Sequence, residues 1–165
     1  MVLIALGLSF VVWFLVQGAN RPADPYFRSA VKGFGEQAFS IEARGEQGSG
    51  SSRCALVAVT EAQLSRGLMG RRDLGGYDGM IFRFATEGLR SFTMHGTLIP
   101  LSIAWFDADG NLVDRAEMTP CPEGVSCPDY ASARPYQYAL ETGRGGLREL
   151  GVGPGAHLTL GATCA

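Results

Sequence analysis

The stretch SIAWFDADGNLVDRAE, residues 102–117, decides the fold class of this 165-residue chain. Its two ends, 102–106 and 112–117, are short and strand-like. Between them, Asp107 to Asn111 supplies residues that tolerate positive φ, which predicts a β-hairpin. The glycine stands before Asn111, whereas a calcium loop needs it after a third ligand. We therefore interpret this segment as a hairpin and not as a calcium site.

Further strand patterns lie on both sides of this hairpin. The capping-box pattern Thr60 to Gln63 predicts a short helix from Glu61 to about Met69, and a second helix is predicted from Thr142 to Leu150. These patterns indicate the α+β class, mainly antiparallel β, as a compact small barrel or sandwich with two short helices. The further strands are predicted at residues 38–43, 54–59, 80–84, 89–94, 136–141 and 157–160.

The N-terminal segment Val2–Val16 is apolar apart from Ser9, and the small residues Gly18 and Ala19 follow it. This pattern is typical of a signal peptide. It is shorter than the roughly 20 residues of a comfortable membrane span, although an uncleaved anchor is the alternative. Basic residues follow the segment and none precedes it, the reverse of the positive-inside expectation. Residues 1–19 are expected to be a signal peptide or membrane anchor, and either places the rest outside the cytoplasm.

The composition predicts one globular domain behind a tether. Residues 20–37 are mixed and contain prolines, and residues 38–165 are expected to form a single domain, since 46% hydrophobic and 18% charged residues are ordinary for a globular protein. The 14 basic residues nearly balance the 16 acidic ones, and no Lys/Arg run could follow a phosphate backbone. Nucleic acid is therefore not an expected partner.

Four cysteines form an even set, which in an exported protein indicates two disulfides. Cys121 and Cys127 each precede proline, which stiffens the loop, and a local bond is expected between them. Cys54 begins an early strand and Cys164 follows the last one. These two are expected to form a second bridge if the ends of the domain pair in one sheet.

Several motifs together resemble one family. They are Arg66-Gly-Leu-Met69, Gly79-Met-Ile-Phe82, the segment from Phe92 to Leu101, Phe106-Asp-Ala-Asp-Gly110, and the two Cys-Pro pairs at 121 and 127. In this order and spacing the chain resembles the domain of unknown function 192 family over about residues 38–160. The resemblance implies a small, β-rich and often exported domain, and it supplies no biochemical role. The chain departs from the family pattern at His95 and Gly96, where a basic residue and asparagine are usual, and at Ser102, where aspartate is usual.

The segment around residues 92–102 carries the most suggestive polar side chains. Met94, His95, Thr97 and Ser102 are the candidate binding surface. If the strand alternates, Phe92 and Met94 face one side while Thr93 and His95 face the other. No metal is expected. The alternative is a soft-metal site of Met94, His95 and Met118, since thioether and imidazole suit copper(I), although methionine more often fills cores.

No catalytic residue or cofactor is expected, because the sequence contains neither a nucleophile elbow nor a phosphate loop. Paired carboxylates are the remaining option for catalysis, and no pattern brings two of them into a cleft. The leading hypothesis is a non-catalytic, extracytoplasmic module that binds a small ligand or an envelope partner. The alternatives are an envelope enzyme with an unfamiliar site and a copper-handling protein. The available carboxylates are Asp78, Asp107, Asp109, Asp114, Glu117 and Glu141.

Overall fold

The computed structural model describes residues 28–43, 50–122 and 124–164. The expected signal peptide or anchor at 1–19 lies outside these residues, as does the first part of the tether. Within the described part, no helix is long and apolar enough to cross a membrane. The elements are, in chain order, β1 (Gly35–Glu42), β2 (Arg53–Ala58), α2 (Glu61–Arg66), β3 (Gly79–Gly88), β4 (Ser91–Thr93), β5 (Leu101–Phe106), β6 (Leu112–Met118), β7 (Asp129–Ala131), β8 (Tyr136–Gly143), α3 (Gly146–Glu149) and β9 (His157–Leu160).

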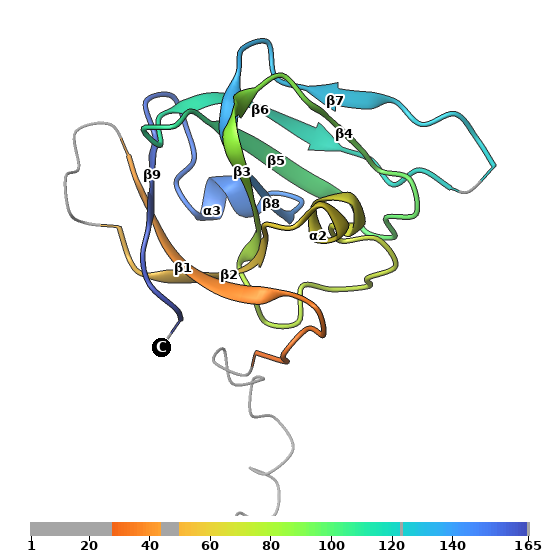
Figure 1. Ribbon diagram of the computed structural model, residues 1–165, viewed down its shortest axis with the longest axis horizontal. Coiled ribbons are helices and arrows are strands. Elements are labelled where there is room, and N and C mark those ends of the chain that lie inside the picture. Colours follow the sequence, from red (N-terminus) through yellow and green to blue (C-terminus); the bar gives the residue numbers. More distant parts are fainter. Residues whose placement is uncertain (1–27, 44–49, 123, 165) are drawn as a thin grey trace, which may run out of the picture.

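A seven-stranded sheet in the order β6-β5-β8-β3-β2-β1-β9 forms the body of the domain, and β4 pairs with β7 in a small second sheet. The large sheet curls into a half-barrel (Figure 1), and its two edges meet where Asn111 and His157 form an isolated antiparallel bridge. The predicted α+β class with mainly antiparallel strands is therefore confirmed. One pairing is parallel: β2 lies alongside β3, and α2 makes the crossover between them.

The hairpin predicted from residues 102–117 joins β5 to β6. The backbone N–H of Asp107 donates to the Asn111 carbonyl at 3.0 Å, and the Asp107 carboxylate accepts from the Asn111 N–H at 2.8 Å. Gly110 adopts φ 87°, a conformation that a residue with Cβ rarely takes. The hairpin turn predicted at Asp107 to Asn111 is therefore confirmed.

Helix α2 starts as predicted and ends earlier. The Thr60 hydroxyl accepts from the Gln63 N–H, and the Gln63 side-chain oxygen accepts from the Thr60 N–H, so both halves of the capping box are present. The helix ends at Arg66 because Gly67 takes a positive φ of 45°. The second helix was predicted to begin at Thr142, and this is wrong: β8 continues through Gly143, and α3 has only four residues.

Two groups of buried side chains cover the two faces of the sheet. The smaller group includes Phe39, Phe106 and Leu158 and packs against Leu147 of α3. Because its members come from both edges of the sheet, it lies inside the curl. The larger group lies on the other face, beneath α2 and the β4–β7 pair. It includes Leu56, Met80, Phe82, Ile103 and Trp105.

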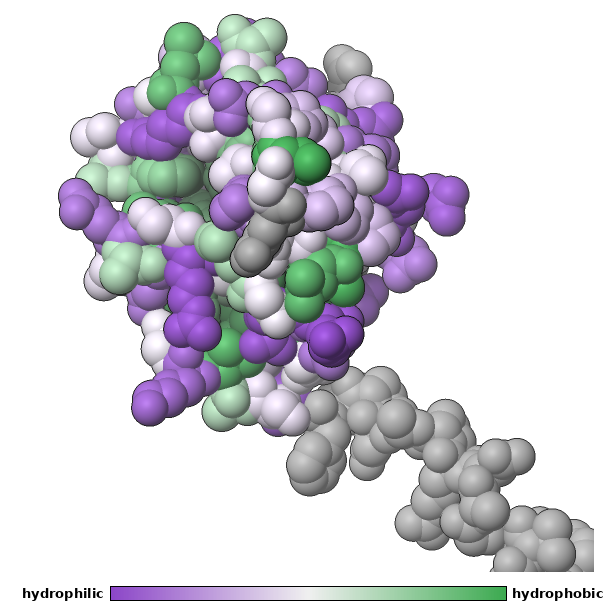
Figure 2. Space-filling view, turned by 90° about the vertical axis from the view of Figure 1, so that its right-hand side faces the viewer, coloured by the Kyte–Doolittle hydropathy of each residue, from purple (hydrophilic) through white to green (hydrophobic). Residues whose placement is uncertain are grey.

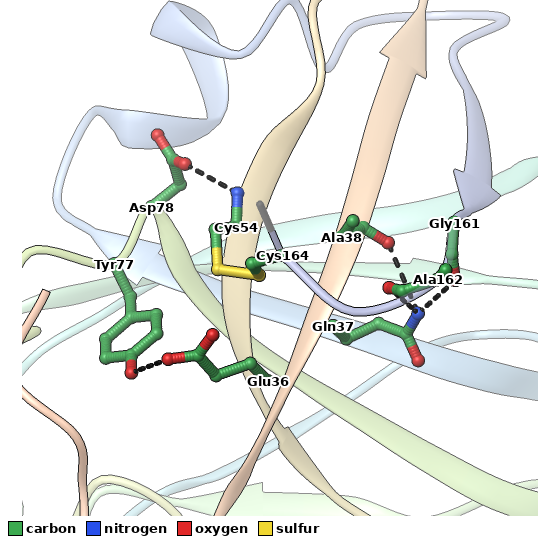
Figure 3. The surroundings of a disulfide bond; sticks show 9 residues. All are labelled: Glu36, Gln37, Ala38, Cys54, Tyr77, Asp78, Gly161, Ala162 and Cys164. Carbon is green, nitrogen blue, oxygen red and sulfur yellow. Dashed lines mark hydrogen bonds between the residues drawn. A yellow bond between two sulfur atoms is a disulfide. The ribbon is translucent and has the colours of Figure 1, made fainter. Parts of the chain in front are cut away.

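The C-terminal segment is fastened to the first two strands. Cys54 of β2 is bonded to Cys164, with the Cα atoms 5.6 Å apart, as the sequence led us to expect. The Gln37 side chain of β1 donates to the Gly161 carbonyl, and the Cys54 N–H donates to the Asp78 carboxylate at 2.9 Å (Figure 3). The two ends of the described chain are therefore held together by a covalent bond and by strand pairing.

Candidate functional site

A cleft of about 290 Å³ lies between α2, β3 and β4. One wall is the C-terminal half of α2 and the turn after it, residues 64–69, and the opposite wall is residues 90–93 at the start of β4. Phe82 and Phe84 of β3, together with Thr97 and Glu141, complete the lining. This volume lies just below the usual range for small-molecule sites, roughly 300 to 1,000 Å³.

Glu141 is the unusual residue of this cleft. It lies in β8 with Met80 of β3 and Ile103 of β5 as its register partners, both fully buried, so its side chain leaves the sheet on the face that carries the larger core group. Only 5% of Glu141 is exposed, and its carboxyl group has no hydrogen-bond or ion-pair partner among the described residues. Its carboxyl oxygens are not among the fully buried, unpartnered polar atoms of the described residues, so they reach the cleft, which makes Glu141 the strongest indication of a binding site.

Burial raises the pKa of Glu141 to about 8. The cause is desolvation, since a low-dielectric surrounding disfavours the charged carboxylate. At neutral pH the group is therefore mostly a neutral carboxylic acid that can donate one hydrogen bond. Titratable groups with strongly shifted pKa values in a cleft are candidates for function.

Two arginines give the cleft its positive charge. Arg66 is exposed at the end of α2, with its guanidinium 6.0 Å from the Phe34 ring. Arg90 stacks on the Phe84 ring at 4.2 Å and donates to backbone carbonyls, including that of Thr86 at 3.0 Å. Both arginines belong to the lining of the cleft, and a guanidinium suits an anionic group of a ligand.

The structure separates the residues of the predicted binding surface. Met94 is fully buried in the larger core group, and His95 on the next position is exposed, which agrees with the predicted alternation. Nδ1 of His95 lies 4.0 Å from Sγ of Cys127, and Cys127 is bonded to Cys121. Met118 belongs to the same core group as Met94, so His95 does not join the two methionines of the alternative metal set.

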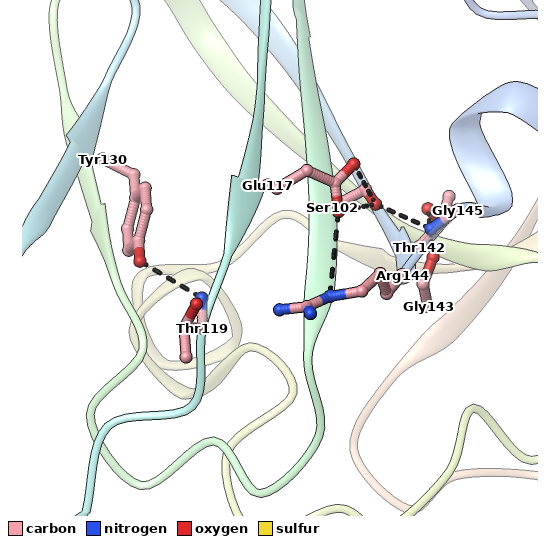
Figure 4. Close-up of polar contacts among 8 residues, drawn as sticks. All are labelled: Ser102, Glu117, Thr119, Tyr130, Thr142, Gly143, Arg144 and Gly145. Carbon is pink, nitrogen blue, oxygen red and sulfur yellow. Dashed lines mark hydrogen bonds and ion pairs between the residues drawn. The ribbon is translucent and has the colours of Figure 1, made fainter.

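Thr97 and Ser102 lie in different places. Thr97 lines the cleft and is only 5% exposed. Ser102 is fully buried on the opposite face of the sheet, where it donates to the Glu117 carboxylate at 2.8 Å and accepts from the Gly145 N–H at 3.0 Å (Figure 4). Ser102 therefore fastens the start of α3 to β5 and does not contribute to the cleft.

Ser102→Ala is expected to destabilise the domain by roughly 1 to 3 kcal/mol, because the partly buried Gly145 N–H loses its acceptor. Urea unfolding of the variant measures this loss. Ser126→Ala, which removes an exposed hydroxyl, is the matched control and is expected to change little. Equal effects of the two substitutions would show that the Ser102 contacts are not structural.

The sequence offered one weak signal for Glu141. The sequence predicts a strand from Tyr136 to Glu141, and Glu141 is one of the available carboxylates. The sequence does not show that Glu141 is buried, because the neighbouring strands determine which face of this strand is covered. The pairing of β8 with both β3 and β5 makes it a central strand. A charged residue at this position therefore has a neighbouring strand on each side. The convergence of α2, β4 and β8 on one cleft is long-range and has no local sequence pattern.

Comparisons with known proteins agree with this architecture. No curated protein matches the chain. A Sinorhizobium meliloti 1021 protein, proposed to be a transcription regulator, has a similar crystal structure, with a TM-score of 0.66 and 25% identity over 80% of this chain and 98% of that one. A protein of unknown function from Novosphingobium aromaticivorans DSM 12444 has a TM-score of 0.65 and 27% identity, over 86% of this chain and 94% of that one.

The family comparison covers most of the domain. Residues 43–160 match the DUF192 family, whose description is "Uncharacterized ACR". This span includes every element from β2 to β9, and with them the whole cleft. The chain belongs to the DUF192 family.

Proposed function

We propose that this protein is an extracytoplasmic module that binds a small organic anion in the cleft between α2 and β4. The observation that carries the proposal is the buried, unpartnered carboxyl of Glu141 in a cleft that two arginines also line. The unpartnered carboxyl marks the cleft as a place where a ligand would add interactions, and the two arginines favour an anionic group in that ligand. Thr97, one of the residues predicted from sequence, lines the same cleft.

The location outside the cytoplasm is supported by the cysteines and the N-terminal segment. Both disulfides of the structure are compatible with an oxidising compartment. The apolar residues 2–16 have the composition of a targeting segment. If this segment is cleaved, the domain is released from the membrane. If it is retained as an anchor, the domain stays attached to the membrane.

The cleft is favoured over a hollow of about 380 Å³ beside Arg115, Glu117 and Arg148, because the Glu117 carboxylate there already accepts from Ser102. Among the residues that the structure describes, the exposed large hydrophobic ones are Val59, Met69, Leu89, Leu98 and Val125. Figure 2, which views the side that lies at the right in Figure 1, shows hydrophobic patches separated by hydrophilic residues. Scattered apolar side chains are normal on a protein surface, and those in this view do not merge into one large patch.

Catalysis and nucleic-acid binding have less support. The cleft contains one titratable carboxyl, and a second catalytic group does not lie beside it among the described residues. Regulation of transcription, proposed for the relative from S. meliloti, is not extended to this chain because its net charge is −2 and no basic run is present. Copper handling is also less favoured, since His95 points away from the buried Met94.

Arg66→Gln is expected to reduce the amount of co-purified ligand by roughly tenfold or more, because a guanidinium that binds an anion contributes on the order of 1.5 to 3 kcal/mol. The full chain is produced by export, purified natively and denatured, and the released small molecules are measured by mass spectrometry. Arg72→Gln removes the same charge at an exposed position outside the cleft and is the matched control. Equal occupancy of both variants, or no small anion released by the unmodified protein, would contradict the proposal.

A further inference from the structure

The cleft contains groups of opposite electrostatic preference at different depths. Glu141 is 5% exposed and leaves the sheet between Met80 and Ile103, whereas Arg66 is exposed at the end of α2. Arg66, Arg90 and Glu141 are the charged or titratable side chains among the described residues of the lining, which comes from α2, β3, β4, β8 and the turn before β5. An anion at the arginines therefore leaves Glu141 without a partner.

Aromatic residues line the same cleft. Phe82 and Phe92 meet edge to face with their centroids 5.0 Å apart, and Phe84 lies 6.5 Å from Phe92. All three rings line the cleft. Faces of aromatic rings attract cations, and Arg90 already uses the Phe84 ring in this way at 4.2 Å. A second cation beside Phe82 and Phe92 would find aromatic surface together with the Glu141 carboxyl.

We propose that the ligand of the cleft is a small zwitterion, with an ammonium group that pairs with Glu141 and a carboxylate or phosphate that binds Arg66 and Arg90. This inference rests on the proposed function and specifies its ligand. A plain anion satisfies the arginines alone, and a plain amine meets two positive side chains in the same lining. A molecule with both charges can place its ammonium group at Glu141 and its anionic group at the two arginines at the same time.

The pairing has a definite proton balance. In the empty cleft the desolvated Glu141 is mostly a neutral acid at pH 7, because its pKa is about 8. An ammonium group beside it favours the carboxylate and lowers this pKa. The Glu141 O–H bond breaks, the ammonium–carboxylate pair forms, and one proton passes to the solvent. Binding of a zwitterion therefore releases about 0.9 proton per ligand at pH 7, the fraction of Glu141 that is protonated beforehand.

Isothermal titration calorimetry of the exported full chain tests this inference. The probes are linear ω-amino acids from glycine to aminohexanoate and ethanolamine phosphate, each titrated at pH 7 in bis-Tris and in Tris. The two buffers differ in ionisation enthalpy, so the difference in heat gives the number of protons released. We expect at least one zwitterion to bind with release of about 0.9 proton and the release to become small at pH 9, where Glu141 is already ionised.

Matched ligands and variants separate this inference from the proposed function. Glu141→Gln is expected to weaken zwitterion binding by roughly tenfold or more and to abolish proton release, while Glu149→Gln, at an exposed carboxylate, changes neither. Fatty acids of equal chain length test the arginines alone. If they bind as tightly as the amino acids without proton release, the zwitterion is wrong and the anion site stands. If no zwitterion of the series binds, the inference is also overturned, and the co-purification experiment decides the anion site independently.

Discussion

Glu141→Gln is expected to make the domain more stable than the wild type above pH 8 and to leave its stability nearly unchanged below pH 4.5. The folded-state pKa of Glu141 is about 8, and the ordinary value is 4.5. Between these values the folded protein binds a proton that the unfolded chain releases. Stability of the wild type therefore falls as pH rises through this window.

The size of the effect follows from the same two pKa values. Each pH unit in the window changes the free energy of unfolding by about 1.4 kcal/mol, so the whole window corresponds to about 5 kcal/mol. Glutamine has nearly the shape of the neutral acid and does not ionise, so the variant lacks this loss. The largest difference between the two proteins is expected at pH 9.

Urea unfolding at several pH values from 4 to 9 measures this difference. Glu149→Gln is the control, because its carboxylate is exposed and its removal is not expected to alter the slope. Parallel pH profiles of the wild type and Glu141→Gln would show that Glu141 ionises normally in the folded protein. That result would also remove the main support for the cleft as a binding site.

Replacing both Cys54 and Cys164 by serine is expected to lower the free energy of unfolding by roughly 4 to 5 kcal/mol. The bond spans 110 residues of sequence, and the loop-entropy model gives about 4.7 kcal/mol for a loop of this length. Domains are stable by only about 5 to 15 kcal/mol, so the variant is expected to be marginal. Thermal and urea unfolding of the exported protein measure the loss.

The Cys121–Cys127 bond provides an internal comparison. Its sequence separation is 6, for which the same model gives about 2 kcal/mol. The serine variant of this pair is therefore expected to lose about half as much stability as the Cys54 and Cys164 variant. Equal losses, or a larger loss from the short loop, would mean that native contacts and not loop length determine these contributions.

Local patterns in the sequence predicted most of the elements. The Asp107 to Asn111 turn and the Thr60 to Gln63 capping box involve residues a few positions apart, so their chemistry is readable directly. The strand Asp129–Ala131 was not predicted, because three residues give too little alternation to recognise. The start of the second helix was misplaced, since Thr142 and Gly143 pair with Ser102 and Leu101 of β5, and this partnership overrides local helix signals.

The candidate site was less predictable than the fold. The segment from Met94 to Ser102 was singled out for its polar side chains, yet strand alternation and the turn at Gly96 distribute them among the core, the solvent, the cleft and the opposite face of the sheet. Of these residues only Thr97 lines the cleft. Glu141 was one of several carboxylates, and only the sheet order shows that it is buried.

The bond between Cys54 and Cys164 makes most of the domain a covalent macrocycle. Residues 54 to 164 form a closed ring, and the smaller ring of Cys121 and Cys127 lies within it. A single proteolytic cut in any loop of the large ring opens the ring without releasing a fragment, because both pieces stay joined through the sulfur atoms. Such nicked molecules keep their full mass plus one water and separate only after reduction, so the domain tolerates a single cut without losing part of its chain.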